Sequence, residues 1–392
     1  MEESHTDVRK GSRVSKDVFQ SQSPDPLTIV MRKAHELYGD PLPTQVNDRL
    51  VWELNAVRAN EYASRFMAVS RIAQKMRDTG FTLRGWGTGD VSLTGMLCGV
   101  SEINPLPPHY RCPHCQHSAF DVPKTILSGY DLPQKRCPIC GTTMCSDGQA
   151  IPAELCFGVN GDMPPHFVWA CSSEGIEWLQ KQAEALHTEG TLFQVIDGCI
   201  ISDLLEIVPD WHEALLQKLQ KQVGLQSIPL DIATREVLHS GKCTTDPKCA
   251  EILYGGLPHE ESRTTFGEVI WETSVSHLQP EGRWALQALR QDGKDISEIP
   301  FCRENAFLQL SEFGLSQSEA MQILNTAIDY RRATIHSSDI QMMKGVGVPA
   351  WHLDTLPFLR NLWRKAHSVS SLQTVLKILY QHETNAPKGS AV

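Results

Sequence analysis

The sequence predicts a mixed α/β protein that continues into a mostly helical region and carries a metal site in its α/β part. Apolar residues return at helical intervals before residue 80 and again from about Thr264 onward. Between them, the runs 167–171 and 191–208 are rich in β-branched and aromatic residues, which favour strands. Four cysteines also lie as two spaced pairs between these regions.

Length and composition narrow the possible domain count, partners and location of the protein. The 392 residues are enough for two or three packed units. The formal net charge of −10 excludes a global positive field, so any grip on nucleic acid would have to be a local patch. The first 25 residues are polar and unlike a signal peptide, and no run reaches the roughly 18 apolar residues of a membrane span. We therefore expect a cytoplasmic protein without a membrane partner, whose cysteines are thiols or metal ligands rather than disulfides.

The first part of the chain predicts helices. Asp25 and Pro26 are typical of a helix start before the segment 27–39. The segment 46–80 also has helical periodicity, with an apolar stripe at Leu50, Leu54 and Val57. Between Gly85 and Pro108, glycines and short apolar runs indicate turns and strands.

After residue 167, the predicted helices are bounded by N-capping residues at their starts and by glycines at their ends. The strands at 167–171 and 191–208 should be joined by a helix that opens at Ser172 or Ser173 and closes at Gly190. Another helix should begin at Asp210 and end before Gly224. In the last region, Ser316 and Glu319 form the pattern of a capping box.

The cysteine pairs predict a structural zinc site. Two C-x-x-C knuckles, separated by the interval of a four-cysteine zinc ribbon, would give a closed tetrahedral shell with no position for substrate. Gly141 would permit the tight turn after the second knuckle. Cys145 and three histidines, at 109, 114 and 117, are nearby substitutes that we expect to face solvent. The predicted ligands are Cys112, Cys115, Cys137 and Cys140.

A resemblance to a known family rests on several long segments. NPLPPHYRCPHCQHSAF, SGYDLPQKRCPICGT and DGQAIPAELCFGVNGDMPP resemble the palm region of the PolC-type DNA polymerase III alpha subunit of low-GC Gram-positive bacteria. Upstream, RKAHELYGDPLPTQVNDRLVWEL is similar to the lead-in to that palm. Downstream, RTTFGEVIWETSVSH, SEIPFCRENAF and VPAWHLDTLPFLRNLWRKAHS are similar to pieces of its fingers region. The resemblance runs collinearly over about residues 26–383.

This resemblance implies a nucleotidyltransferase-type palm with an inserted zinc knuckle, followed by a helical fingers-like region. The implied boundaries are a disordered polar tail at 1–25, a helical lead-in at 26–83, a degenerate palm-like domain at 84–225 with its knuckle at 110–145, a fingers-like region at 226–385 and a tail at 386–392. Nothing in the chain resembles the family's oligonucleotide-binding, exonuclease or histidinol-phosphatase-like domains.

The catalytic carboxylates that the resemblance leads one to expect are missing. Strand synthesis needs two magnesium ions on hard oxygen ligands, which the family supplies as three aspartates. The matching positions here are His166, Val168 and Val208. Valine cannot bind a metal, and neutral imidazole is a poor magnesium ligand, so we expect no catalytic residue and no magnesium. Glu206 or Asp210 could act as displaced ligands, since both share strand parity with Val208.

The loop that would meet the triphosphate is also altered. The residues GWGTGD, 85–90, replace a serine-rich and glycine-rich family pattern. An arginine that would meet phosphate becomes Trp86, and Asp90 would place a negative charge where a polyanion should sit. We interpret these glycines as an ordinary turn rather than a phosphate-binding loop.

Four residues remain as candidates for contact with DNA phosphates. Lys365 and His367 match a fingers motif of the family, and Arg360 and Arg364 lie just before them. The alternative is a solvated basic face at a helix end. A clamp-binding peptide at 309–313 is not favoured, because the segment falls within a predicted helix and Glu312 interrupts its apolar spacing.

Three functional hypotheses follow. The first is a pseudo-polymerase of DNA replication that binds primer-template DNA or replication proteins. The second is an active polymerase fragment with displaced metal ligands. The third is a zinc-dependent protein-interaction scaffold that does not touch DNA. The sequence leaves the partner and the oligomeric state open.

Overall fold

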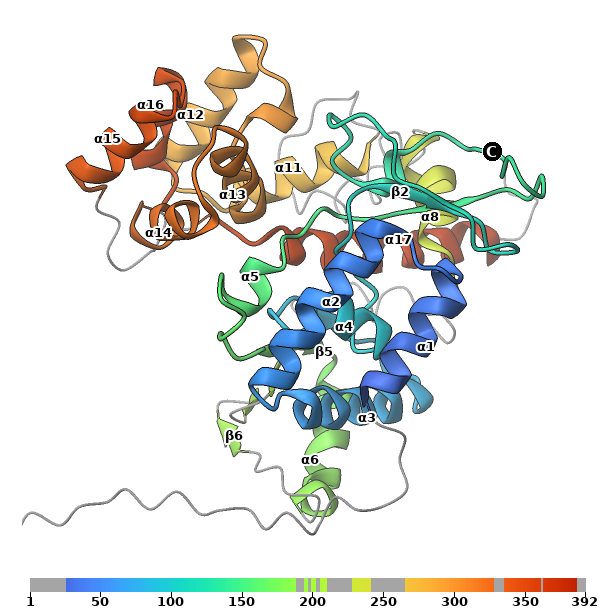
Figure 1. Ribbon diagram of the computed structural model, residues 1–392. Coiled ribbons are helices and arrows are strands. Elements are labelled where there is room, and N and C mark those ends of the chain that lie inside the picture. The colour runs from blue at the N-terminus through green and yellow to red at the C-terminus, as the bar shows by residue number, and fades with distance from the viewer. Residues whose placement is uncertain are drawn as a thin grey trace, which may run out of the picture.

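The computed structural model describes residues 26–187, 194–196, 199–201, 205–209, 228–240, 265–327, 335–360 and 362–385 (Figure 1). The predicted cap at Asp25, the helix end at Gly190 and the helix from Asp210 to Gly224 lie outside these residues. The described part is a mixed α/β structure with many helices and two small sheets. None of its helices is long and apolar enough to cross a membrane.

Three helices open the fold: α1 (Pro26–Tyr38), α2 (Thr44–Ala59) and α3 (Ala63–Asp78). The helical periodicity of 46–80 is thus split in two, which the sequence pattern did not predict. Glu61 adopts a left-handed backbone with φ of 58°, and the Tyr62 N–H donates to the carbonyl of Val57 at 2.9 Å. This turn ends α2 without the help of a glycine.

The larger sheet has the strand order β1-β5-β8-β7-β6. Its strands are β1 (Arg84–Gly85), β5 (Phe167–Cys171), β6 (Gln194–Ile196), β7 (Cys199–Ile201) and β8 (Leu205–Pro209). Strands β5 and β8 are parallel and the other pairs are antiparallel. Helix α6 (Ser173–His187) follows β5, and the Ser172 side chain accepts a hydrogen bond from Gly175 N, so the predicted strand at 167–171 and the predicted helix start are confirmed.

The odd-numbered residues of β5 anchor this sheet to the helices before it. Phe167, Trp169 and Cys171 are fully buried. The Phe167 ring meets Phe66 of α3 edge-on, with centroids 5.2 Å apart. Since side chains alternate along a strand, the even-numbered residues face the opposite side of the sheet.

The second sheet belongs to the cysteine-rich segment. It has the order β3-β2-β4, from β2 (His109–Arg111), β3 (Ser118–Ala119) and β4 (Cys145–Asp147). Along the chain, the short helix α4 (Leu93–Leu97) precedes this sheet, η2 (Gly129–Asp131) lies between β3 and β4, and α5 (Glu154–Phe157) follows β4. A separate small core lies here, made of Tyr110, Cys112, Leu132, Cys137 and Met144.

The rest of the described chain is helical. Its elements are α8 (Leu230–Ala233), the π-helical turn η4 (Thr234–His239), α11 (Phe266–Ser276), α12 (Pro280–Gln291), η5 (Ile296–Glu298), α13 (Arg303–Glu312), α14 (Gln317–Ala327), α15 (Ser337–Gly345), α16 (Ala350–Thr355), η6 (Leu356–Phe358) and α17 (Lys365–Asn385). The predicted capping box is confirmed, because Ser316 and Glu319 exchange hydrogen bonds at the start of α14. Gln309 and Leu310 are buried within α13.

Helices α12 to α16 gather in one lobe, and α17 leaves it to run across the middle of the molecule (Figure 1). Two sets of hydrogen bonds join residues 127–149 to α17 and α11. The Lys365 ammonium donates to the carbonyls of Leu127 and Gln149, each at 2.6 Å. Asp131 accepts from Phe266 N and Gly267 N and so caps α11.

Candidate functional site

His166, Val168 and Val208, which the resemblance matches to the family's carboxylates, lie on or next to strands β5 and β8 of the larger sheet. Val168 pairs with Glu206, and Ala170 pairs with Val208, so these residues share one face. His166 immediately precedes β5 and is exposed, whereas Val168, Glu206 and Val208 are half-buried. Glu206 is the one carboxylate in this register between Phe167 and Cys171 on β5 and Leu205 and Pro209 on β8.

Trp86 covers part of this face. The β1 register continues past Gly85, because Trp86 N donates to the carbonyl of Val168 at 3.1 Å. Trp86 therefore shares the face with Val168, and its side chain is only 7% exposed. Arg84 lies on the same face, with its guanidinium 5.2 Å from the Trp86 ring centroid.

The carboxylate of Asp90 does not face a ligand. It is fully buried and accepts hydrogen bonds from Gly87 N at 2.7 Å, from Val168 N at 2.9 Å and from the indole N–H of Trp169 at 2.7 Å. The expectation that Asp90 would repel a bound polyanion is therefore wrong. Asp90 instead links the loop to β5 through these hydrogen bonds. Burial raises the pKa of Asp90 to about 7, although its three donors act in the opposite direction.

Most of the backbone N–H groups that follow Trp86 are already engaged within the described part of the chain, those of Thr88 and Asp90 excepted. Glu53, buried on α2, accepts from the first N–H groups of α4 and thus takes the place that an anion could have. Gly87 lies against β5, where an added Cβ would fall 2.3 Å from the carbonyl oxygen of His166. The residues whose backbone N–H donates to an acceptor of the protein itself are Trp86, Gly87, Gly89, Val91, Ser92, Leu93, Thr94 and Gly95.

An aromatic stack lies between the sheet and α17. We define it as Trp86, His367, Trp363 and His277. The centroid of His367 lies 5.0 Å from Trp86 and 4.9 Å from Trp363, and His277 stacks on Trp363 at 3.4 Å. Burial, followed by the charge of Arg364, lowers the pKa of His367 to about 3, so its imidazole is neutral at physiological pH.

The four predicted phosphate contacts are therefore placed differently from one another. Lys365 is 2% exposed and its ammonium serves two backbone carbonyls, so it does not face solvent as expected. His367 is half-buried in the aromatic stack and uncharged. Arg364 is half-buried and Arg360 is exposed. The sequence motif could not reveal the burial of Lys365, because Leu127 and Gln149 are more than 200 residues away along the chain.

The four predicted zinc ligands come together. The sulfur atoms of Cys112, Cys115, Cys137 and Cys140 all lie within 4.8 Å of one another. Cys112 Sγ is 3.4 Å from Cys140 Sγ, and Cys115 Sγ is 3.5 Å from Cys137 Sγ. Four sulfurs at about 2.3 Å from a tetrahedral zinc ion would stand about 3.8 Å apart, so the donor set fits zinc.

The two knuckles repeat one backbone design. Cys112 and Cys137 each accept at their carbonyl from the residue four positions later, and those residues, Gln116 and Gly141, both have positive φ, at 58° and 75°. The turn expected at Gly141 therefore recurs at Gln116, a position without a glycine to signal it.

One nearby residue was wrongly expected to face solvent. His109 is fully buried, where its Nε2 lies 3.2 Å from the Tyr38 hydroxyl and its ring stacks on Phe120. It packs β2 against α1 and is not an alternative ligand. His114 is exposed, whereas His117 and Cys145 are half-buried.

Comparisons of the sequence with known proteins all point to one kind of polymerase. Residues 27–138 match the family model described as the bacterial DNA polymerase III alpha NTPase domain. The chain is 43% identical over 455 aligned positions to the PolC-type DNA polymerase III of Pediococcus pentosaceus, covering 90% of this chain and 32% of that protein. The chain is 25% identical to the PolC-type DNA polymerase III of Lacticaseibacillus paracasei, a match that covers 90% of this chain and 31% of that protein. It is 40% identical to the PolC-type DNA polymerase III of Caldanaerobacter subterraneus, a match that covers 42% of this chain and 12% of that protein. The chain thus spans at most about a third of these curated relatives, and it is a PolC-like relative.

Proposed function

We propose that this PolC-like relative is a pseudo-polymerase of DNA replication: a polymerase core that binds a replication partner and does not add nucleotides. One observation carries the proposal most directly. The backbone N–H groups of Trp86, Gly87, Gly89 and Val168, where a nucleotide and its metal ions would meet the family's palm, donate to Asp90 and to neighbouring carbonyls.

The side chains on the same face support the proposal. Two magnesium ions need several oxygen ligands at about 2.1 Å. Val168 and Val208 offer none, and Trp86 fills space beside Val168. A triphosphate would have to displace the indole and break the hydrogen bonds of Asp90, and it would find a neutral imidazole at His367.

The retained structural chemistry suggests what the protein does instead. We propose that the four cysteines hold a structural zinc ion, which keeps the knuckles in place above the small core. The segment between Leu132 and Cys140 presents Lys135 and Arg136 to solvent, and Arg360 is exposed on the helical lobe. Each of these exposed cations would supply a local contact to a phosphate of primer-template DNA in a chain of negative net charge.

Fluorescence anisotropy with a labelled primer-template across a salt series tests this function. We expect binding at low salt that weakens steeply as salt rises, because each phosphate contact releases counterions. The double variant Lys135→Gln/Arg136→Gln should bind more weakly with a shallower salt slope, whereas the control Lys344→Gln, an exposed lysine on α15, should bind like the wild type.

The alternatives give other outcomes. Absence of binding at low salt would remove DNA as a partner and favour the zinc-dependent scaffold, whose partners are proteins. An active polymerase with displaced ligands is favoured by one observation alone, the position of Glu206 opposite Val168. Asp210, the other proposed ligand, lies outside the described residues.

A further inference from the structure

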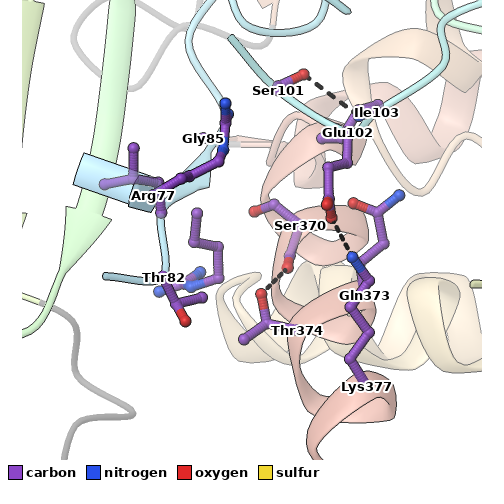
Figure 2. Close-up of a pocket in the computed structure, with 12 residues that line it drawn as sticks. Arg77, Thr82, Gly85, Ser101, Glu102, Ile103, Ser370, Gln373, Thr374 and Lys377 are labelled. Atoms are coloured by element: carbon purple, nitrogen blue, oxygen red, sulfur yellow. Dashed lines mark hydrogen bonds and ion pairs between the residues drawn. The ribbon is translucent and has the colours of Figure 1, made fainter. Parts of the chain in front are cut away.

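A small polar cavity lies beside the sheet, between the end of α3, strand β1 and the middle of α17 (Figure 2). Its volume is about 40 Å³. Arg77 and Thr82 lie on one side of it, and Ser370, Gln373 and Thr374 of α17 lie on the other. It is separate from the buried Asp90 carboxylate, which points to Gly87, Val168 and Trp169.

Positive charge dominates the lining. Arg77, Arg84 and Lys377 all line the cavity, against the single carboxylate of Glu102. Lys377 pairs with Glu102 at 2.5 Å, and its side chain is 6% exposed, whereas that of Glu102 is 40% exposed. The Arg77 guanidinium donates to the carbonyls of Gly99 and Val100, which fixes its position at the wall. The lining therefore holds three cationic side chains against one carboxylate, and because Arg84 and Lys377 are buried, their Coulomb attraction to an anion is stronger than it would be in bulk water.

Several uncharged residues of the lining are polar, beside the apolar Leu83 and Ile103. Ser101, Ser370 and Thr374 place hydroxyl groups at the cavity, and each donates to a backbone carbonyl. The Thr82 hydroxyl makes no hydrogen bond within the described part of the chain, so it has a donor to offer. Such a lining favours a compact anion over an apolar ligand, and the positive excess disfavours a metal cation.

We propose that this cavity binds inorganic phosphate. A single water needs about 10–15 Å³ of such space, so 40 Å³ exceeds one water but leaves no room for a nucleoside. Arg77, Arg84 and Lys377 would neutralise the tetrahedral oxyanion, and Thr82 would donate to one of its oxygens. The anion would join α17 to α3 and β1, and this inference does not depend on whether the chain binds DNA.

Isothermal titration of inorganic phosphate into the full chain, at constant pH and ionic strength set with chloride, tests the proposal. We expect a dissociation constant in the low millimolar range or tighter, about 1 mM. Lys377→Gln should weaken binding about tenfold, since it removes one charge–charge contact. Thr374→Leu should abolish binding, because it fills the cavity and leaves every cation in place. Lys344→Gln, on α15 and away from the cavity, should bind phosphate like the wild type.

The same titration with adenosine monophosphate separates the two sources of a phosphate group. Binding at least about tenfold weaker than that of inorganic phosphate supports a closed site for the free anion. Three results would overturn the proposal: no heat from the wild type at about 20 mM phosphate, equal affinity in Thr374→Leu, or adenosine monophosphate that binds as tightly as phosphate. Thermal unfolding of each variant without phosphate confirms that it is folded.

Discussion

The two zinc knuckles and the Gly85–Asp90 loop are both signatures of the same family resemblance, and they differ in what remains of their chemistry. In the knuckles, all four donor atoms are present and gathered within 4.8 Å. In the loop, the carboxylate of Asp90 accepts hydrogen bonds from the N–H groups of Gly87 and Val168, so these donors have partners within the protein. The knuckles therefore present a complete donor set to a metal ion, whereas the loop directs its own carboxylate to backbone N–H groups of the protein.

The energetic reason lies in what each region depends on. The knuckle core has only five buried residues, too few to hold a fold without a staple. The sheet is held by Phe167, Trp169 and their neighbours on the face opposite Val168. Its stability therefore does not depend on carboxylates at Val168 or Val208, and the buried Trp86 and Asp90 add contacts to β5.

Loss of zinc should have the largest effect. Binding of structural zinc contributes on the order of 10 kcal/mol to the folding of small zinc sites, so Cys137→Ser should release the ion and unfold the knuckles. Metal analysis should give one zinc per chain in the wild type and much less in the variant, and proteolysis should cut between residues 110 and 145. Cys145→Ser is the matched control, because Cys145 is half-buried nearby and outside the sulfur cluster. Full zinc content and protease resistance in Cys137→Ser would contradict the account.

Removal of the Trp86 ring should come next. Trp86→Ala should lower the free energy of unfolding by about 3 kcal/mol, because it leaves a cavity between the sheet and α17. The variant should also raise the pKa of His367 from about 3 towards its ordinary value, since burial is the main cause of the depression. Denaturant unfolding and NMR titration of the imidazole measure both. Trp284→Ala, at a tryptophan that is 65% exposed, should cost less than about 0.5 kcal/mol.

Asp90→Asn tests the internal acceptor. Its three partners are all donors, so an amide would place an NH₂ group against at least one N–H. We expect a loss of about 2 kcal/mol in the free energy of unfolding at pH 5, measured by denaturant titration. Asp162→Asn, at an exposed carboxyl, should change it little. Equal stability of Asp90→Asn and wild type would show that the bonds of Asp90 contribute nothing.

The free energy of unfolding should also depend on pH through Asp90. The pKa of Asp90 is raised from 3.8 to about 7 in the folded protein, so between these values the native state holds a proton that the unfolded state has lost. Stability from this group is therefore fully present below pH 4 and is lost as pH rises to 7, by up to about 4 kcal/mol. The stability advantage of wild type over Asp90→Asn should shrink across this window. An advantage that grows with pH would mean that the carboxylate is ionised throughout.

These regions also show how far sequence reasoning reached. The spacing of Cys112 to Cys140 is local and contains its own geometry, so the site could be predicted, as could the strand at 167–171 and the cap at Ser316. The roles of Asp90 and Lys365 depend on partners such as Val168, Leu127 and Gln149, far away along the chain. The charge of each side chain suggested an exposed position for both residues. Their tertiary contacts instead bury them, because Asp90 and Lys365 bind backbone groups of distant segments.

The smallest expected effect lies at the exposed end of the aromatic stack. His277 is exposed and stacks on Trp363. His277→Ala should lower the free energy of unfolding by about 0.5–1 kcal/mol, the usual worth of an aromatic pair near the surface. A larger loss in denaturant unfolding, comparable to that of Trp86→Ala, would show that the stack acts as one unit rather than resting on its buried end.

Single-nucleotide primer extension by the purified chain tests the central claim most directly. With magnesium or manganese, a primed template and the matching nucleotide, we predict no extension above a no-protein control, because Glu206 is the one carboxylate that the paired residues of β5 and β8 offer beside Val168 and Val208, and Trp86 and Asp90 occupy the surroundings. Templated incorporation of one nucleotide that disappears in Glu206→Gln would contradict the account and identify Glu206 as a displaced metal ligand.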